Sequence, residues 1–232
     1  MKQKQGLYER YAKRLLDIVL SGMALIFLSP ILLLLTIVGA VMMKGNPFFT
    51  QLRPGKDEKI FRLIKFRTMT CEKDENGNFL PDEVRLTKYG KFLRSTSLDE
   101  LPELFNILKG DMAIIGPRPQ LVRDMVFMTD VQRLRHTVRP GLSGLAQVNG
   151  RNAIKWENKL EFDLEYIKNI TFFGDISLIF QTCGKVFKRA DISEEGMETA
   201  EDLGDYLLRI GNIDEKTYDA NQERVKELIG VF

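Results

Sequence analysis

Two adjacent carboxylates lie in the stretch of the sequence that is best suited to chemistry. Asp99 and Glu100 belong to Ser95–Lys109, a segment whose apolar residues Leu101, Leu104, Phe105 and Leu108 recur at helical spacing. A carboxylate at a helix N-terminus stays ionised, and the free N–H groups there also bind phosphate. One carboxylate could therefore attack phosphorus while its neighbour holds a hard divalent cation such as Mg²⁺.

The same pair also has a purely structural interpretation. Ser97-x-x-Glu100 is a capping box, and acidic residues in a first turn stabilise a helix. Gly110 follows as a helix stop. Local sequence favours the cap over the catalytic interpretation, and it does not exclude either.

Phosphate chemistry at this pair would need cations. A carboxylate approaching a diphosphate is repelled by about 4 kcal/mol per charge pair at 4 Å and an effective dielectric of 20. Lys65 and Arg67 share one face of a predicted strand, and the stiff turn Gly116–Pro119 presents Arg118. Together with Mg²⁺ they could offset the repulsion. For Lys65 and Arg67 alone, a solvated strand face is the simpler interpretation.

The elements that must position these residues can be read from the patterns around them. Pro47–Gln51 and Ile60–Met69 flank the turn Arg53–Gly55 and predict a β-hairpin. Further helical patterns lie near Val122–Arg135, Lys155–Lys168 and Ser177–Arg189. The last is amphipathic, which suits a membrane surface as well as packing on the body.

A membrane segment precedes this body. Ile18–Met43 is a run of 26 residues without a charged side chain, a length that is typical of a membrane helix. It is too long for a signal peptide and no small-residue cleavage site follows it. Ser29-Pro30 lies in its middle, and proline kinks a helix because it has no N–H. The halves would measure roughly 16 and 20 Å, whereas a hydrocarbon core is about 30 Å thick.

Both flanks of the run are basic, so the positive-inside rule gives no direction of crossing. They contain Lys2, Lys4, Arg10, Lys13 and Arg14 before the run, and Lys44, Arg53, Lys56, Lys59 and Arg62 after it. A bent segment that enters and leaves on the cytoplasmic side satisfies both flanks. An ordinary kinked helix that spans the membrane is the alternative.

Composition narrows the class of protein. The 232 residues are 44% hydrophobic and 28% charged, as in a folded protein. Residues 191–232 carry a net charge of −8 and residues 1–190 carry +10. The basic body suits anionic partners such as phosphates and acidic lipid.

The remaining residue types exclude several kinds of site. Cys71 and Cys183 indicate neither a disulfide framework nor a zinc site. The lone His136 is more readily a structural hydrogen-bonding residue than a base. Without a Walker, dinucleotide or nucleophile-elbow pattern, kinases, dehydrogenases and serine hydrolases find no support.

Read in order, the motifs resemble those of the small monotopic phosphoglycosyl transferases, the bacterial sugar transferase family. The resemblance runs from about Tyr11 to Arg189. Its motifs are Lys13–Asp17, Ser29-Pro30, Lys65–Met69, Ser97–Pro102, Leu108–Met112, Gly116–Pro119, Arg139–Gly141 and Ala146–Asn152. Each motif is weak alone, and their order and spacing behind one Ser-Pro membrane run are specific.

The resemblance implies an α+β, mostly helical fold at the cytoplasmic face of a bacterial inner membrane. Residues 1–43 would form a basic segment and a re-entrant helix-break-helix, 44–190 a catalytic domain with a small β-hairpin, and 191–232 an acidic extension. The implied reaction moves a sugar-1-phosphate from a UDP-sugar to polyprenyl (undecaprenyl) phosphate and releases UMP through a covalent aspartyl-phosphosugar. UDP-sugar, polyprenyl phosphate and membrane lipid would be the partners, with downstream glycosyltransferases as further candidates and no nucleic acid.

The resemblance also implies roles for single residues. Asp99 matches the nucleophile and Glu100 its Mg²⁺-associated partner. The other matching positions are Lys65, Arg67 and Arg118 for phosphate, Asp163 as an acidic position linked to the site, Asn149 and Arg151 for substrate, and Ser29 and Pro30 at the membrane break.

Two features depart from the family pattern. Leu145 stands where the family often has tryptophan, which affects packing near the nucleotide. The acidic extension exceeds the short core, and Ser193–Gly196 resembles the transferases that use diacetylated bacillosamine, which favours an N-acetylated amino sugar. Apolar stripes near Leu203–Ile210 and Val225–Ile229 predict two helices that pack on the body's far side or on a partner and add no chemistry. A solvated tail is the alternative.

Two other functions remain compatible with the sequence. A membrane-bound nucleotide-sugar hydrolase would use the same dyad with water as acceptor. A non-catalytic membrane scaffold would use the carboxylates only to cap a helix.

Overall fold

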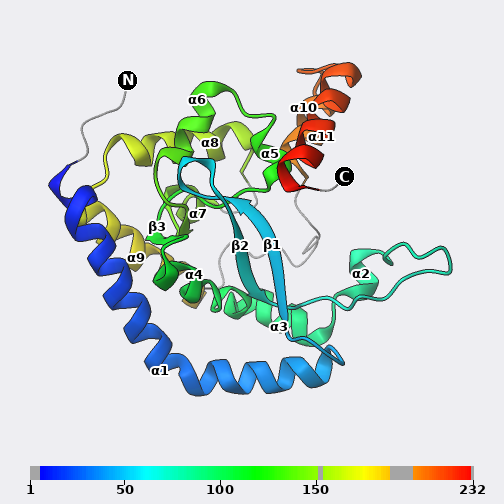
Figure 1. The fold of residues 1–232 in the computed structure, drawn as a ribbon. Coiled ribbons are helices and arrows are strands. Elements are labelled where there is room, and N and C mark those ends of the chain that lie inside the picture. Colours follow the sequence, from blue (N-terminus) through cyan, green and yellow to red (C-terminus); the bar gives the residue numbers. More distant parts are fainter. Residues whose placement is uncertain (1–5, 151–153, 189–200, 231–232) are drawn as a thin grey trace.

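The computed structural model describes residues 6–150, 154–188 and 201–230 and shows a mostly helical body (Figure 1). Its α-helices are α1 Lys13–Met42, α2 Asp82–Arg85, α3 Lys88–Thr96, α4 Glu103–Lys109, α5 Val122–Met125, α6 Asp130–Arg133, α7 Leu145–Val148, α8 Trp156–Lys168, α9 Phe172–Lys188, α10 Leu203–Arg209 and α11 Glu215–Ile229. Shorter turns are a π-helical η1 Tyr8–Ala12 and the 3₁₀ turns η2 Lys56–Glu58, η3 Leu98–Glu100 and η4 Leu134–Thr137.

Two small sheets complete the α+β fold. β1 (Phe48–Pro54) pairs antiparallel with β2 (Ile60–Phe66), which confirms the predicted hairpin. The turn lies at Gly55–Lys59, later than the predicted Arg53–Gly55, because Arg53 and Pro54 still pair with β2. β3 (Ala113–Ile115) and β4 (Gly141–Ser143) form a second, parallel pair that the sequence did not predict. Each of these strands has only three residues, and a parallel pair has no connecting turn to announce it.

The membrane run forms one continuous helix with a bend rather than two helices separated by a break. Pro30 lies inside α1, and Figure 1 shows the helix changing direction along its length. Because proline has no N–H, the carbonyl of Ile26 loses its usual partner. The hydroxyl of Ser29 donates to this carbonyl oxygen at 2.7 Å. The Ser-Pro pair therefore bends the helix and satisfies the carbonyl that the bend exposes.

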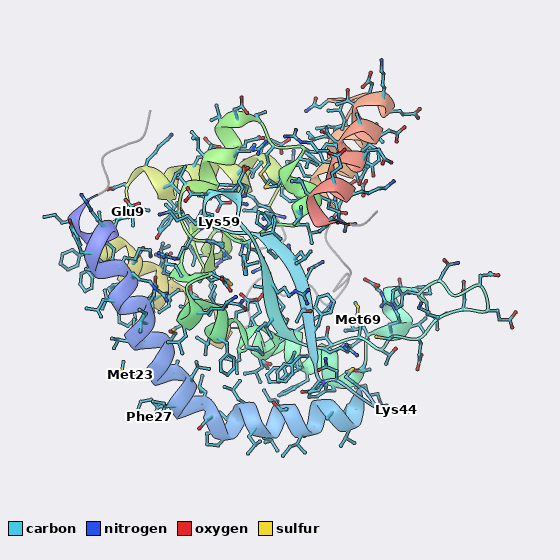
Figure 2. All side chains as sticks on the ribbon, in the orientation of Figure 1. Glu9, Met23, Phe27, Lys44, Lys59 and Met69 are labelled. Atoms are coloured by element: carbon cyan, nitrogen blue, oxygen red, sulfur yellow. The ribbon has the colours of Figure 1, made fainter. Side chains whose placement is uncertain are left out.

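The outer side of α1 is apolar and uncovered. Ile26 and Phe27, just before the bend, are 72% and 78% exposed. Figure 2 shows Met23 and Phe27 on the side of the helix that faces away from the body. Among the described residues, this is the one helix long and apolar enough to cross a membrane. Such a surface is out of place in water and suits lipid.

Both limbs of α1 are attached to the same body. On the first limb, Asp17 accepts the backbone N–H of Ile114 at 2.9 Å, and Arg14 donates to the carbonyl of Ile107 at 2.6 Å. On the second limb, the carbonyl of Leu35 accepts the hydroxyl of Tyr89 at 2.9 Å. The helix thus leaves the body and returns to it.

The C-terminal part differs from the predicted pattern in two ways. The helical pattern at Val122–Arg135 is divided into α5, α6 and the start of η4, and α9 begins at Phe172, ahead of the predicted Ser177.

The two predicted extension helices, α10 and α11, pack on the body. Leu203 and Val225 join Phe127, Trp156 and Leu160 in one buried cluster. Figure 1 shows them on the side of the body away from α1, as predicted.

Candidate active site

The dyad lies in the 3₁₀ turn η3, between α3 and α4. Ser97 precedes it in a left-handed conformation (φ 56°) that ends α3, and its side chain makes no capping hydrogen bond. The predicted capping box is therefore wrong. The chain reverses at Ser97 instead of starting a helix there, and the 3₁₀ turn that follows brings Glu100 to Lys65 of β2, with Asp99 half-buried beside it.

Glu100 is the centre of a partly buried ion cluster. Its Oε1 atom lies 2.7 Å from Nζ of Lys65 and 3.0 Å from Nη2 of Arg118. Burial raises the pKa of Glu100, but the two cations outweigh it and hold this pKa far below its ordinary value. Burial lowers the pKa of Lys65, and the carboxylates around it raise it overall. The sequence-predicted residues Glu100, Lys65 and Arg118 therefore meet as charged groups.

A third carboxylate, which the sequence analysis missed, lies in the same cluster. Glu103 is only 3% exposed, and its Oε1 is 3.1 Å from Nζ of Lys65. Burial first, and then the charge of Glu100, raise the pKa of Glu103 to about 7 against the opposing charge of Lys65. Glu103 did not stand out in the sequence, because an acidic residue in the first turn of a helix is usually solvated. The signal that could have identified it is its distance of three residues from Glu100, which places both on one helical face.

The buried side of α4 differs from the predicted apolar stripe. It contains Leu104 and Ile107 together with Glu103 and Asn106, whereas Phe105 and Leu108 of the predicted stripe are 49% and 40% exposed. Asn106 accepts the backbone N–H of Ile64 at 3.1 Å and donates to the carbonyl of Arg62 at 2.7 Å. This amide fixes β2 on α4 and so sets the place of Lys65 beside the dyad.

Asp99 has a different environment from Glu100. No hydrogen bond or ion pair engages its carboxylate among the described residues. Burial, followed by the negative charge of Glu100, raises the pKa of Asp99 to about 6, with Lys65, Arg94 and Arg118 opposing. Two neighbouring carboxylates are thus separated into one pinned by cations and one left available, as a division of tasks requires.

The loop that carries Arg118 is held by its backbone. Arg135 is fully buried, donates to the carbonyl of Arg118 at 2.5 Å, and binds Asp163 at 2.6 and 2.9 Å. Arg53 donates to the carbonyl of Pro119 at 3.0 Å. Asp163 therefore lies near the site as expected, but it acts on the backbone of Arg118 and not on its guanidinium: it binds Arg135, and the backbone N–H of Arg118 also opposes the rise of its pKa on burial. The sequence analysis identified neither arginine as part of the site. The partners of Arg135, which are Asp163 and the carbonyl of Arg118, and the partner of Arg53, the carbonyl of Pro119, are all distant in the sequence.

The remaining predicted residues are not brought to the dyad by any described contact. The side chain of Arg67 makes no hydrogen bond or ion pair within the described part of the chain. Asn149 donates to the carbonyl of Leu145 at 2.8 Å and is exposed there. Arg151 lies outside the described residues. His136 is buried and contacts Glu58 and Arg135 rather than the dyad, which agrees with a structural role.

The donor set fits Mg²⁺ that is shared with a substrate. Both cations contact Oε1 of Glu100, and none of the described side chains pairs with its Oε2. No group of three or more His, Cys, Asp or Glu side chains in the described ranges could hold a metal. Mg²⁺ commonly binds one or two carboxylates and completes its shell with phosphate oxygens and water. Glu100, with Asp99 beside it, meets that requirement only when a phosphate compound is present.

The dyad is also attached to the apolar helix. Leu98 and Leu101, which flank it, pack against a buried cluster that includes Leu35. Leu32 and Val38 of the same limb of α1 border this cluster. The residues on either side of the dyad therefore pack in the same apolar cluster as the second limb of α1.

The sequence of this chain is similar to those of known proteins. The profile of the family described as bacterial sugar transferase matches residues 8–189. The uncharacterized sugar transferase EpsL of Bacillus subtilis is 47% identical over 190 residues, which are 82% of this chain and 94% of EpsL. UDP-glucose:undecaprenyl-phosphate glucose-1-phosphate transferase of Klebsiella pneumoniae is 42% identical over 75% of this chain, and 40% of that relative is covered.

A third relative carries the name of a different sugar. UDP-N-acetylgalactosamine-undecaprenyl-phosphate N-acetylgalactosaminephosphotransferase of Aeromonas hydrophila is 37% identical over 74% of this chain and is covered over 43% of its length. The chain thus spans nearly all of EpsL and less than half of these two longer relatives.

The buried Arg135–Asp163 pair predicts a large stability effect. Arg135→Met should lower the free energy of unfolding by about 3–5 kcal/mol, because it leaves the carboxylate of Asp163 buried without a partner. The control is Arg209→Met, which breaks an ion pair with Glu201 whose side chains are 61% and 39% exposed. It should cost less than about 1 kcal/mol. Denaturant unfolding in detergent measures both, and equal effects would contradict the assignment.

His136 predicts an acid-sensitive stability. Burial, and then the charge of Arg135, lower the pKa of His136 from 6.5 to about 4. Between pH 6.5 and 4 the unfolded chain therefore binds the extra proton, so the contribution of His136 to stability should fall as pH falls through this window, by at most about 3 kcal/mol. Asp99 and Glu103, whose pKa values are raised, act in the opposite direction, so the contribution is measured as the difference between the wild type and His136→Gln. As pH falls from 6.5 to 4.5, the unfolding free energy of the wild type should decrease relative to that of His136→Gln, and a pH-independent difference would rule out this histidine as a source.

Proposed function

Because the chain belongs to the bacterial sugar transferase family, we propose that it moves a sugar-1-phosphate from a UDP-sugar to undecaprenyl phosphate at the cytoplasmic face of a bacterial inner membrane. The observation that carries the proposal is the divided dyad: Glu100 is pinned by two cations, and Asp99 beside it is free. The names of the Klebsiella and Aeromonas relatives support the pair of substrates.

The dyad suggests a two-step transfer. A carboxylate oxygen of Asp99 attacks the sugar-bearing phosphorus, an oxygen–phosphorus bond forms, and the bond to the UMP oxygen breaks. A phosphate oxygen of the lipid then attacks the same phosphorus, the bond to Asp99 breaks, and the carboxylate is regenerated. UMP leaves after the first step and polyprenyl-diphosphate sugar after the second.

The cluster supplies the electrostatics of these steps. Lys65 and Arg118 face the dyad as charged groups and can stabilise negative charge that develops on the diphosphate. Mg²⁺, when bound by Glu100 together with substrate phosphates, supplies further positive charge. Arg135 and Arg53 hold the backbone of the Arg118 loop, so the cation does not need to be ordered during the reaction.

α1 supports a re-entrant arrangement and a lipid acceptor. A helix that spans would place its ends on opposite sides of the bilayer, yet Asp17 on one limb and Leu35 on the other bind the same body. A bent α1 that enters and leaves on one side keeps both contacts. It would also keep the apolar α1 close to the dyad through the cluster that Leu98 and Leu101 share with Leu35, which favours a lipid over water as acceptor.

The sugar is the least constrained part of the proposal. The family relatives are named for glucose and for N-acetylgalactosamine, so membership alone does not select one. We favour an N-acetylated amino sugar on the resemblance of Ser193–Gly196, a segment outside the described residues. Turnover of a panel of UDP-sugars with undecaprenyl phosphate tests this choice directly.

The nucleophile has a direct test. Asp99→Asn should lower turnover by at least about a thousandfold while the fold survives, because an amide oxygen does not form the acyl phosphate. Incubation with UDP-sugar alone should add one sugar phosphate to the mass of the wild type and none to the variant. Glu58→Gln, which alters a carboxylate at the distant hairpin turn, should retain the adduct. An Asp99→Asn enzyme with full activity would contradict the mechanism. Without polyprenyl phosphate, UMP release should stop at one equivalent per enzyme, and continued turnover would indicate a hydrolase.

The topology of α1 can be measured in intact cells. Single cysteines replace Arg10 and Lys59, exposed residues on either side of α1, after Cys71 and Cys183 are changed to serine. An impermeant thiol reagent should label neither position until the cells are opened. Labelling of position 10 alone from outside would show that α1 spans. Pro30→Ala should shift molecules towards spanning, since a straight helix of about 39 Å can cross the core.

A further inference from the structure

The C-terminal extension is docked on the segment that follows Arg118. Leu203 of α10 is 3% exposed and packs with Phe127 and Trp156 in one buried cluster. Gly204 lies so close to Phe127 that an added Cβ would be 2.5 Å from its ring. The family profile ends at residue 189, so α10 and α11 lie beyond the shared domain. The extension is thus a close-fitting addition to that domain.

One buried carboxylate joins the extension to the domain. Asp124 in α5 is 2% exposed, and its Oδ2 accepts the backbone N–H of Leu121 at 2.9 Å. Its Oδ1 accepts the backbone N–H of Leu203 at 2.9 Å. The adjacent Arg123 forms an ion pair with Asp202 at 2.6 Å. A carboxylate of the shared domain therefore depends on a donor from outside that domain.

Asp124 also holds the end of the loop that carries Arg118. Leu121, whose N–H it accepts, is the last residue of that loop before α5. Arg53 anchors the same loop by donating to the carbonyl of Pro119 at 3.0 Å. The charge of Asp124 acts in the same direction, because it opposes the lowering of the pKa of Arg53 by burial and by Arg118.

We propose that the extension positions Arg118: the buried carboxylate of Asp124 binds the N–H of Leu203 and the N–H of Leu121 together, so the docking of α10 fixes the end of the Arg118 loop. The residues between the end of β3 at Ile115 and the start of α5 at Val122 form no helix or strand of their own. Such a loop needs anchors if its side chain is to meet Glu100 in one geometry, and preorganised cations are worth most at a reacting phosphate. The extension then serves the transfer without touching substrate and without adding a reacting group.

A pair of variants at one residue isolates the key hydrogen bond. Leu203 is the first residue of α10, and Asp202 before it is extended (φ −69°, ψ 155°), so proline is tolerated at this position. Leu203→Pro removes the N–H that Asp124 accepts, whereas Leu203→Ala keeps it and loses more of the buried side chain. A difference between the two reports the hydrogen bond rather than the apolar packing.

The expected result is a change in substrate affinity. Leu203→Pro should raise the KM for UDP-sugar about three- to tenfold over Leu203→Ala, the range for a lost buried hydrogen bond. A merely structural role would lower the active fraction and the apparent kcat and leave KM unchanged. In an Arg118→Lys background the difference in KM between Leu203→Pro and Leu203→Ala should largely disappear, because the lost hydrogen bond acts through the position of Arg118. Glu223→Gln, which alters an exposed ion pair on α11, should change nothing.

A second measurement keeps the proposal testable apart from turnover. Amide exchange in residues 116–125 should be faster in Leu203→Pro than in Leu203→Ala, and Asp202→Asn, which weakens only the pair with Arg123, should give a smaller increase. Equal KM values and equal exchange in the two Leu203 variants would overturn the proposal. The KM prediction rests on the proposed function, because it assumes that the protein turns over a UDP-sugar. A folded wild type that turned over no UDP-sugar would contradict that function. The amide-exchange comparison would still show whether the extension holds the Arg118 loop in place.

Discussion

One carboxylate oxygen, Oε1 of Glu100, is the point at which three distant segments of the chain meet. Lys65 comes from β2, Arg118 from the loop after β3, and Glu100 itself from η3. A charge in a partly buried position is costly unless it is paired, so none of the three segments can move away alone. The supporting contacts follow from this constraint. Asn106 satisfies the backbone of β2, and Arg135 satisfies the carbonyl of Arg118.

The charged cluster lies beside an apolar helix, and α4 separates the two environments. Its buried side contains Glu103 and Asn106, which reach the ion cluster and β2, and Leu104 and Ile107, which pack in a cluster bordered by Leu25 and Leu28 of α1. Arg14 of α1 donates to the carbonyls of Ile107 and Leu108 at the end of the same helix. α4 therefore connects α1 to the charged cluster.

The bend of α1 solves a backbone problem that arises wherever proline interrupts an apolar helix. An unsatisfied carbonyl in hydrocarbon costs several kcal/mol, because no water can reach it. Ser29 supplies the missing donor to Ile26. The bend can then redirect the second limb, and Leu35 and Tyr89 connect that limb to the body. The geometry of the membrane element and the position of the dyad are therefore set together, through Leu98 and Leu101.

Much of this architecture follows from local pattern. The sequence alone determined the family, the β-hairpin, the apolar run with its Ser-Pro bend, and the candidates Asp99, Glu100, Lys65 and Arg118, because residue types at fixed spacing carry these features. It did not determine the left-handed reversal at Ser97, which made the capping box look correct.

Only the tertiary structure decided which charges meet. Glu103, Arg53 and Arg135 are unremarkable in the sequence, and they become part of the site because their partners come from separate elements. The parallel pair of β3 and β4 and the contact between Asp124 and Leu203 were equally hidden. Burial and pairing are properties of non-local contacts, and local periodicity carries no information about which distant segment will supply the partner.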